Sequence, residues 1–419
     1  MFVTKHLPDP NGGGSSQRAW NHLEALRAIG AVTLIFVKRD SAPESNALRL
    51  PDDVAVHRIN FHKPWIRPSG VPGLSLLKHA CVDARPRLLS AEEFTGVDQT
   101  ETLSEQPFDL ALYFRCDCYQ IVGPHLAARR VLVDFDDIES KVIAQENALN
   151  SDRAGKEFFW IGRLLARRQA KLEDRILQEA DEVLVCSEDD AAELRVRNPG
   201  ASIGVVANGL TKEPTTEQQE GCTGSIPAGD TTRRESGDSL YTILFVGTLS
   251  YAPNNDALHF FLQEIFPLLE RGSLPGPLRC VIAGPGASED HLALARAEVS
   301  FLGRVESLTP LYQRADLAIV PIRFGGGTRI KIIEAFSFGV PVVATTLGAE
   351  GLGVRDEQEL LLADDPERFA EACRRLLTDK AFAAKLTREA HALVSRKFSA
   401  QAVQRSLCQR MLGAPPTAD

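Results

Sequence analysis

The sequence lacks three features that would assign it to a class at once. No apolar run reaches the roughly 18 residues that a membrane-spanning helix needs. The net charge is −9 at pH 7, which argues against a nucleic-acid binder, because such proteins carry a basic domain. The start, MFVTKHLPDPNGGG, has no basic stretch followed by an apolar one, so it does not resemble a signal peptide. We therefore expect a cytoplasmic globular protein.

Closely spaced cysteines are also scarce. Eight cysteines are scattered over 419 residues, which suits a reducing cytoplasm better than a disulfide framework. Cys116 and Cys118 form the one close pair, and without further Cys or His nearby they make a poor zinc site. On a strand, the two side chains would share one face. The others are Cys81, Cys186, Cys222, Cys280, Cys373 and Cys408.

What the sequence does contain is an alternation of short apolar runs and helical patterns, long enough for two domains. Such runs are typical of parallel strands that are covered on both faces. The first half therefore predicts a parallel, doubly wound sheet. Because its first strand begins at Met1, we expect either a short strand or a native start further upstream. The predicted strands here are MFVTKHL, AVTLIFV, DLALYF, RVLVDF, EVLVCS and IGVVAN, with helices at 18–30, 156–179 and 188–197.

Residues 211–240 are polar and rich in Gly, Pro, Ser and Thr, which indicates a linker or surface loop. A second series follows, so we expect Rossmann-like domains at 1–210 and 241–398, facing a central cleft, with a helix at 399–412 returning to the first. The predicted strands of this series are YTILFVG, LRCVIAG, VSFLG, LAIVPI, VPVVAT and ELLLA, with helices at 255–270, 288–298, 308–314, 328–338, 366–377 and 380–397.

The stretch FGGGTRIKIIEAFSFGVPVVAT, residues 324–345, has the pattern of an anion site. Glycines between a strand and a helix allow close backbone approach, and free N–H groups at a helix start attract phosphate. Arg329 and Lys331 would lie in the first helical turn, where cations oppose the macrodipole unless an anion binds between them. The alternative is a flexible turn followed by a surface salt bridge between Lys331 and Glu334, which are three residues apart.

A wider pattern favours the anion site. The segments FVGTLSYAPNNDAL, VIAGPG, VSFLGRVES, LYQRADLAIVPIRFGGGTRIKIIEAFSFGVPVVAT and GAEGL resemble the nucleotide-sugar-binding domain of glycosyltransferase family 4, which has the GT-B fold. VDFDDIES, EDRILQEADEVLVCSEDDAAEL and VVANGL extend the resemblance into the first domain. It is strongest over residues 241–362, and it is missing at 40–105 and in the linker. It implies a retaining transferase that uses a UDP-, GDP- or similar nucleotide sugar and no cofactor.

The resemblance also implies roles for single residues. The second glutamate of the family's paired motif falls on Glu334, which would accept hydrogen bonds from the donor ribose. The first falls on Gly326, so it is absent, and donor-sugar recognition is open. Thr248 stands near the family's usual arginine, and YAPNNDA replaces its lysine-bearing turn. Arg329 and Lys331 would then supply the missing cations, as in a similar branch of the family.

Other donor contacts follow from the same resemblance. Gly247 would let the end of its strand approach the diphosphate. The backbone of Gly303, Arg304 and Val305 would contact the base, although an ordinary strand and turn would look alike. The diphosphate cradle would consist of Gly325, Gly326, Gly327 and Thr328.

In the first domain, the loop PDPNGGGSSQR follows the first strand and would contact donor or acceptor through Gly13 and Gly14, unless it is a plain turn. Arg18 could reach an anionic group. Arg115 stands where the family often has histidine, or is a solvated loop cation. In DFDDIES, Asp137 and Glu139 match the family's acidic motif, and Asp137 is our candidate for a catalytic or structural role. GT-B enzymes generally need no metal, so we expect none here.

The resemblance implies a glycan or lipid-linked acceptor and a role in bacterial cell-surface polysaccharide or glycoconjugate biosynthesis. Residues 155–175 are amphipathic and basic, which fits either a packed helix or peripheral contact with the inner membrane. Two other functions stay open: a non-catalytic GT-B scaffold, favoured by the missing glutamate, and another enzyme on this fold, such as a sugar-nucleotide epimerase or a phosphorylase.

Overall fold

The computed structural model describes residues 1–39, 50–61, 94–95, 107–154, 156–211, 240–272 and 274–413. This part of the chain divides into two compact units. Unit 1 comprises Met1–Ala207, Gly325–Gly327 and Val403–Asp419, and unit 2 comprises Asn208–Phe324 and Thr328–Ala402. The predicted linker, except at its two ends, lies outside the described residues, as do Cys81 and Cys222.

Unit 1 is built on an eight-stranded sheet with the strand order β4-β3-β2-β1-β5-β6-β7-β8. All neighbouring strands are parallel except the pair β3 and β4. The short strand β1 is central, because it pairs with both β2 and β5. The bounds are β1 Phe2–Thr4, β2 Val32–Arg39, β3 Val54–Phe61, β4 Phe94–Thr95, β5 Ala111–Phe114, β6 Val131–Asp136, β7 Glu182–Val185 and β8 Ile203–Val205.

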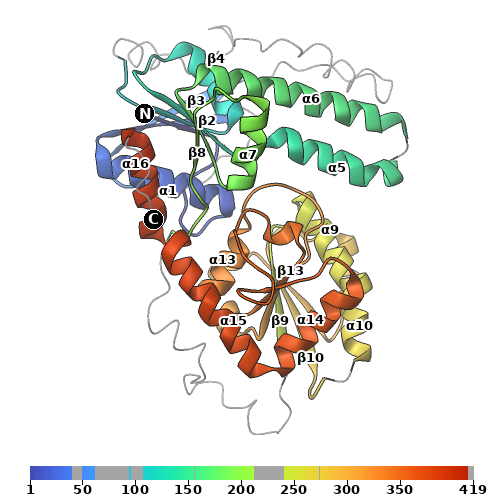
Figure 1. Ribbon diagram of the computed structural model, residues 1–419. Helices are drawn as coiled ribbons and strands as arrows, with labels where there is room; N and C mark the ends of the chain where they lie inside the picture. Colours follow the sequence, from blue (N-terminus) through green and yellow to red (C-terminus); the bar gives the residue numbers. More distant parts are fainter. Residues whose placement is uncertain are drawn as a thin grey trace. The chain divides into compact units, whose positions relative to one another are not determined.

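Alternating side chains divide the core of unit 1 between the two sheet faces. Phe2 packs on one face with the core residues of helix α1 and of the C-terminal helix α16, whereas Val3 packs on the other face. Figure 1 shows α16 beside α1, and Arg410 of α16 bonds Glu182 at 3.1 Å. The helices are α1 Gly14–Ile29, α4 Cys116–Val122, η3 Gly123–His125, α5 Glu139–Ala154, α6 Lys156–Glu179, α7 Glu188–Arg197 and α16 Ala400–Leu412.

Unit 2 contains a six-stranded parallel sheet with the order β11-β10-β9-β12-β13-β14. Its strands are β9 Tyr241–Val246, β10 Leu278–Ala283, β11 Val299–Gly303, β12 Leu317–Val320, β13 Val342–Ala344 and β14 Leu361–Leu362. Its helices are α9 Ala252–Phe260, η5 Phe261–Ile265, α10 Phe266–Arg271, α11 Glu289–Leu292, α12 Thr309–Arg314, α13 Ile330–Ser337, η6 Leu347–Ala349, α14 Pro366–Thr378, α15 Lys380–Leu393 and η7 Val394–Phe398.

Several local predictions need correction. Cys116 and Cys118 start helix α4 instead of sharing a strand face, and both side chains are buried. The helix expected at 18–30 already begins at Gly14, and the helix expected at 288–298 ends at Leu292. Helix α5 was not predicted. Within the described residues, no helix is both long and apolar enough to cross a membrane.

Candidate functional site

In unit 2, neighbouring strands end in or are followed by glycines at the edge of the sheet where their carboxyl ends lie. A Cβ on Gly284 would lie 1.9 Å from the carbonyl oxygen of Gly247. The segments that follow β9 and β10 therefore contact each other through backbone atoms alone. The Gly284 N–H donates to the Gly303 carbonyl at 2.9 Å, which brings the end of β11 to the same place. Of the residues predicted here, Thr248 and Arg304 are exposed and Val305 is partly buried. Ligands of doubly wound sheets bind at this edge.

Helix α9 supplies an amide that fixes a lysine at this edge. The buried Asn254 donates from Nδ2 to the Thr248 carbonyl at 3.0 Å and accepts at Oδ1 from Lys331 Nζ at 2.7 Å. The ammonium also lies 5.1 Å from the centre of the Phe245 ring. A Cβ on Gly247 would come within 2.9 Å of Lys331 Nζ, so a larger residue there would displace the lysine or its partner Asn254. The predicted Gly247 and Lys331 therefore lie together.

The electrostatics of Lys331 are unusual for a lysine. Burial lowers its pKa to about 7, and the positive charge of Arg329 acts in the same direction, whereas Glu334 opposes it. Among the described residues, no carboxylate lies at ion-pair distance from its ammonium. An anion bound here would gain a charge-assisted contact and would return the lysine to its charged form.

Glu334 is held by a tyrosine from the neighbouring helix α12. The Tyr312 hydroxyl donates to Glu334 Oε2 at 3.0 Å and lies 3.3 Å from the Lys331 carbonyl oxygen. Burial raises the pKa of Tyr312 well above its usual value, so the hydroxyl keeps its proton and stays a donor. The Tyr312 ring stacks on the Phe338 ring, with the two ring centres 5.2 Å apart. Lys331 and Glu334 thus have separate partners, which makes the alternative of a surface salt bridge between them wrong.

The helix after the glycine run begins two residues later than the sequence suggests. Helix α13 begins at Ile330, so Arg329 is its N-cap with extended backbone instead of a first-turn residue, and Thr328 is buried before it. Gly325 and Gly327 adopt φ values of 105° and 75°, which L side chains rarely tolerate. The backbone there requires glycine at these two positions, whether or not a ligand binds.

Arg323, just before the glycines, is also anchored by helix α9. Its Nε and Nη2 donate to the two carboxylate oxygens of Asp256 at 2.8 and 2.6 Å, and its guanidinium lies 4.5 Å from the centre of the Phe260 ring. The motif YAPNNDA therefore holds two cations of this region, through Asn254 and Asp256. Asn254, Asp256 and Tyr312 are supporting residues that the sequence pattern did not indicate.

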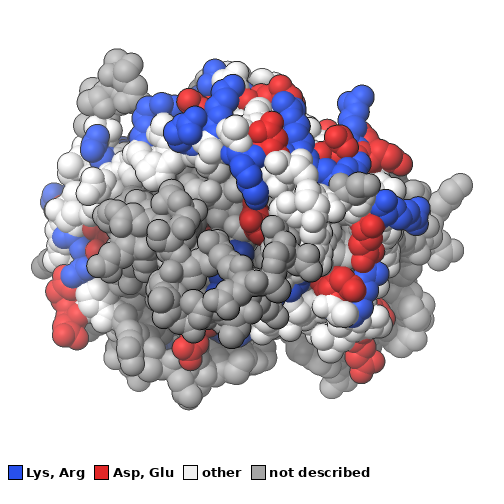
Figure 2. Space-filling model, turned by 90° about the horizontal axis from the view of Figure 1, so that it is seen from below, with Lys and Arg blue, Asp and Glu red and all other residues white. Residues whose placement is uncertain are grey.

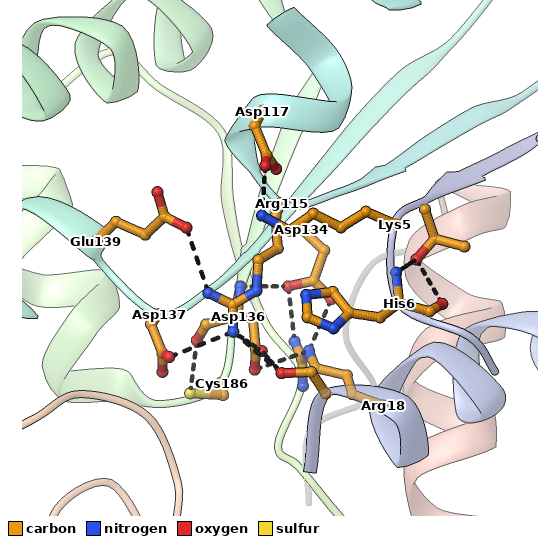
Figure 3. A network of polar contacts seen from close by, with 12 residues as sticks. Lys5, His6, Arg18, Arg115, Asp117, Asp134, Asp136, Asp137, Glu139 and Cys186 are labelled. Carbon is orange, nitrogen blue, oxygen red and sulfur yellow. Dashed lines mark hydrogen bonds and ion pairs between the residues drawn. The ribbon is translucent and has the colours of Figure 1, made fainter. Parts of the chain in front are cut away.

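Unit 1 carries a second polar cluster where β5 and β6 end. Figure 3 shows the Arg115 guanidinium between Glu139 on one side and Asp136 and Asp137 on the other. Arg115 Nη2 lies 2.8 Å from Asp136 and 3.5 Å from Asp137, and Nη1 lies 3.4 Å from Glu139. The Arg115 side chain is only 15% exposed, so it is not the solvated loop cation that the sequence left as an alternative.

The backbone around this cluster is strained. Arg115 and Asp136 adopt φ values of 76° and 60° without being glycine. Such conformations cost about 1–3 kcal/mol each and persist only where surrounding contacts enforce them. Here the ion pair between the two residues supplies that restraint.

Arg18 has a structural role in place of the anion contact that the sequence suggested. Its side chain is 3% exposed and forms a bidentate pair with the buried Asp134, at 2.8 and 3.0 Å, while Nη1 donates to the Val206 carbonyl. His22 contacts the same carboxylate. Arg18 and His22 hold the pKa of Asp134 well below its usual range, against the effect of burial. All three residues belong to one buried network.

The remaining predicted residues of unit 1 lie at the start of α1. Gly13 is its N-cap, and Gly14 is its first residue. A Cβ on Gly13 would meet nothing within 4 Å, whereas one on Gly12 would lie 2.7 Å from Ser16 Cβ. Packing therefore requires a glycine at position 12, beside the two predicted positions. In the part of the chain that is described, no group of three or more His, Cys, Asp or Glu side chains could hold a metal ion.

Surface charge is mixed where it can be seen. On the face in Figure 2, the coloured Lys and Arg side chains stand among Asp and Glu side chains and do not gather into a basic surface. This matches the net charge of −9.

Comparisons with known proteins agree with the fold. The chain shares 17% identity with sucrose-phosphate synthase from Thermosynechococcus elongatus, with a TM-score of 0.67 over 98% of each chain. Anabaena Alr3699/HepE in complex with UDP-glucose matches over 98% of each chain, with 14% identity and a TM-score of 0.62. The chain has the GT-B fold.

Sequence comparison finds a match to a family model in the second half of the chain. Residues 241–379 match the family model of the glycosyl transferases group 1, a range that contains Gly247, Asn254, Lys331 and Glu334. A glycogen synthase of Mycobacterium tuberculosis is 26% identical over 292 residues, which cover 64% of this chain. The match spans 63% of the length of that relative.

Proposed function

We propose that the protein is a glycosyltransferase that moves a sugar from a nucleoside diphosphate sugar to an acceptor hydroxyl. One observation carries the proposal: within the region that matches the glycosyl transferases group 1, Lys331 is held at a glycine-lined strand edge without a carboxylate partner among the described residues. Such a cation suits a diphosphate, which is an anion that can approach backbone closely. The UDP-glucose in Anabaena HepE supports a nucleotide sugar as the donor.

In the proposed reaction, the bond between the anomeric carbon and the diphosphate breaks, and negative charge gathers on the leaving group. Lys331 and Arg329 stabilise that charge. Glu334, oriented by Tyr312, accepts hydrogen bonds from the ribose. The sugar passes through an oxocarbenium-like state, and the acceptor oxygen attacks the same face while its proton passes to the departing diphosphate oxygen, so the configuration is retained. Because protein cations neutralise the leaving group, we propose that the enzyme needs no metal.

The acceptor belongs to unit 1 in this proposal, with Arg115 and Asp137 as the candidates to contact it. We propose a glycan or lipid-linked acceptor, a cytoplasmic enzyme with peripheral contact to the membrane, and a role in cell-surface polysaccharide biosynthesis. A 139-residue match, 27% identical, to an uncharacterised protein of a Klebsiella pneumoniae cps region supports that role.

The test is an assay of nucleoside diphosphate release from a panel of UDP, GDP, ADP and dTDP sugars, with NMR of the product's anomeric centre. We expect turnover of one donor class with retention, and a loss of donor affinity in Arg329→Ala. Binding without turnover across an acceptor panel would favour a scaffold instead. Epimerised donor without an acceptor would favour an epimerase, and no binding of any nucleotide sugar would overturn the proposal. An unchanged affinity in Arg329→Ala would remove that residue from the donor site.

A further inference from the structure

The partner of Lys331 is an amide, whereas Arg18 and Arg115 face carboxylates. Asn254 Oδ1 lies 2.7 Å from Lys331 Nζ, a distance at which an aspartate would form an ion pair. The amide is 8% exposed, and its orientation is fixed because Nδ2 donates to the Thr248 carbonyl. Oδ1 must therefore face the ammonium.

We propose that Asn254 is a positioning residue that holds the Lys331 ammonium at the end of β9 without neutralising it, so that the full charge is left for the diphosphate of the donor. This inference rests on the proposed function and adds a requirement to it: position 254 must have an acceptor, and that acceptor must be uncharged.

The surroundings of Lys331 fit this role. Among the described residues of other elements, the Lys331 ammonium contacts only neutral groups. These are the Asn254 amide of α9 and the Phe245 ring of β9. The charged groups that act on it, Arg329 and Glu334, flank it in sequence. Glu334 in turn accepts a hydrogen bond from Tyr312 of α12. A carboxylate at position 254 would be the nearest charge to the ammonium and would cancel it.

The helix offers a matched control one residue along. Asn254 and Asn255 are the third and fourth residues of α9, where a new carboxylate would be favoured by the helix dipole in either case. Asn254→Asp and Asn255→Asp therefore add the same charge to the same helical turn. Only the first change places that charge against Lys331.

The experiment titrates the full chain at pH 7 with whichever of UDP, GDP and ADP it binds most tightly. We expect Asn254→Asp to weaken binding about tenfold or more and Asn255→Asp to change it less than about twofold. Asn254→Ala, which removes the acceptor but adds no charge, should lose less than Asn254→Asp. If Asn254 had a merely structural role, Asn254→Ala would lose more affinity than Asn254→Asp, because Asp has nearly the same shape as Asn.

The pH profile supplies a second readout. Affinity of the unmodified chain should fall as pH rises above about 7, because Lys331 loses its proton. In Asn254→Asp the carboxylate keeps the lysine charged, so the weaker affinity should stay flat between pH 7 and 9. Equal affinities of Asn254→Asp and the unmodified chain overturn the inference. If the unmodified chain binds no nucleoside diphosphate, the proposed function fails instead.

Folding of the variants is checked by thermal melting. If Asn254→Asp does not fold, the binding titration of Asn254→Ala alone tests the inference. The inference then requires a loss of severalfold, with binding that still falls above pH 7, and an unchanged affinity overturns it.

Discussion

Arg18 and Arg115 of unit 1 and Lys331 of unit 2 have opposite kinds of partners. In unit 1, Arg18 pairs with Asp134 and Arg115 lies among three carboxylates. In unit 2, Lys331 is held by an amide and an aromatic ring, and its pKa is lowered to about 7. Arg18 and Lys331 both lie in helices that follow parallel strands, so the difference lies in the partners and not in the fold.

The difference separates a structural cation from one that is available to a ligand. A buried ion pair that loses one partner leaves an uncompensated charge, so it holds its elements in place. A desolvated lysine with neutral partners gains when an anion arrives. The comparison predicts that changes in unit 1 reduce stability, whereas changes around Lys331 reduce binding.

The largest effect is expected from Arg18→Met. Because the buried Asp134 would lose its bidentate partner, the free energy of unfolding should fall by about 3–5 kcal/mol. Chemical denaturation measures this loss. Arg27→Met on the same helix is the control, since Arg27 pairs with the more exposed Asp53 and Glu24 and should cost much less. Equal losses in the two variants would contradict the assignment of Arg18 to the core.

Lys331→Met should reduce binding and leave the stability of the fold unchanged. Removing a desolvated cation is expected to leave the melting temperature unchanged or slightly higher, while affinity for the nucleoside diphosphate falls about 100-fold because a charge-assisted contact is lost. Calorimetric titration and a thermal melt check the two halves. A variant that melts early and binds normally would reverse the comparison.

Tyr312→Phe should have a smaller effect on binding. The change removes the hydroxyl that orients Glu334 and keeps the ring that stacks on Phe338. We expect donor affinity to fall about tenfold, with KM raised more than kcat is lowered. Tyr119→Phe is the control, because its hydroxyl bonds the exposed Glu179 in unit 1. A Tyr312→Phe variant with unchanged KM would show that Glu334 needs no support.

The smallest effect is a pH dependence with a defined sign. Below pH 7 Lys331 is already charged, and above it binding must restore a proton. Between pH 7 and 8 the affinity should therefore fall about fivefold, and at pH 8 binding should take up close to one proton. Titrations in buffers of different ionisation enthalpy measure that uptake. Lys331→Met should show neither effect.

Much of the fold could be predicted from the sequence, because buried parallel strands leave short apolar runs. The prediction failed where the pattern is weaker. Strand β3, residues Val54–Phe61, contains polar residues between its apolar ones and so forms no continuous apolar run. Helix α5 is polar over most of its length. Gly14 begins a helix although glycine disfavours one, because the tertiary contacts of α1 outweigh local propensity.

The candidate site was predicted unevenly for a physical reason. Lys331, Glu334 and Gly247 come from segments with a recognisable spacing. Their supports, Asn254 and Tyr312, lie about 77 and 19–22 residues away along the chain and meet them only in the folded structure. Arg18 looked like a ligand contact because its buried partner, Asp134, is 116 residues away. Roles that depend on a distant partner are not visible in local patterns.

The most direct test of the account is a calorimetric titration of the intact chain at pH 7 with UDP, GDP and ADP and their sugars, beside Lys331→Met. We expect saturable binding of one nucleotide class to one site, and its loss in a variant that melts no earlier than the unmodified chain. Binding that is equal in both proteins, or no binding of any nucleotide, would contradict it.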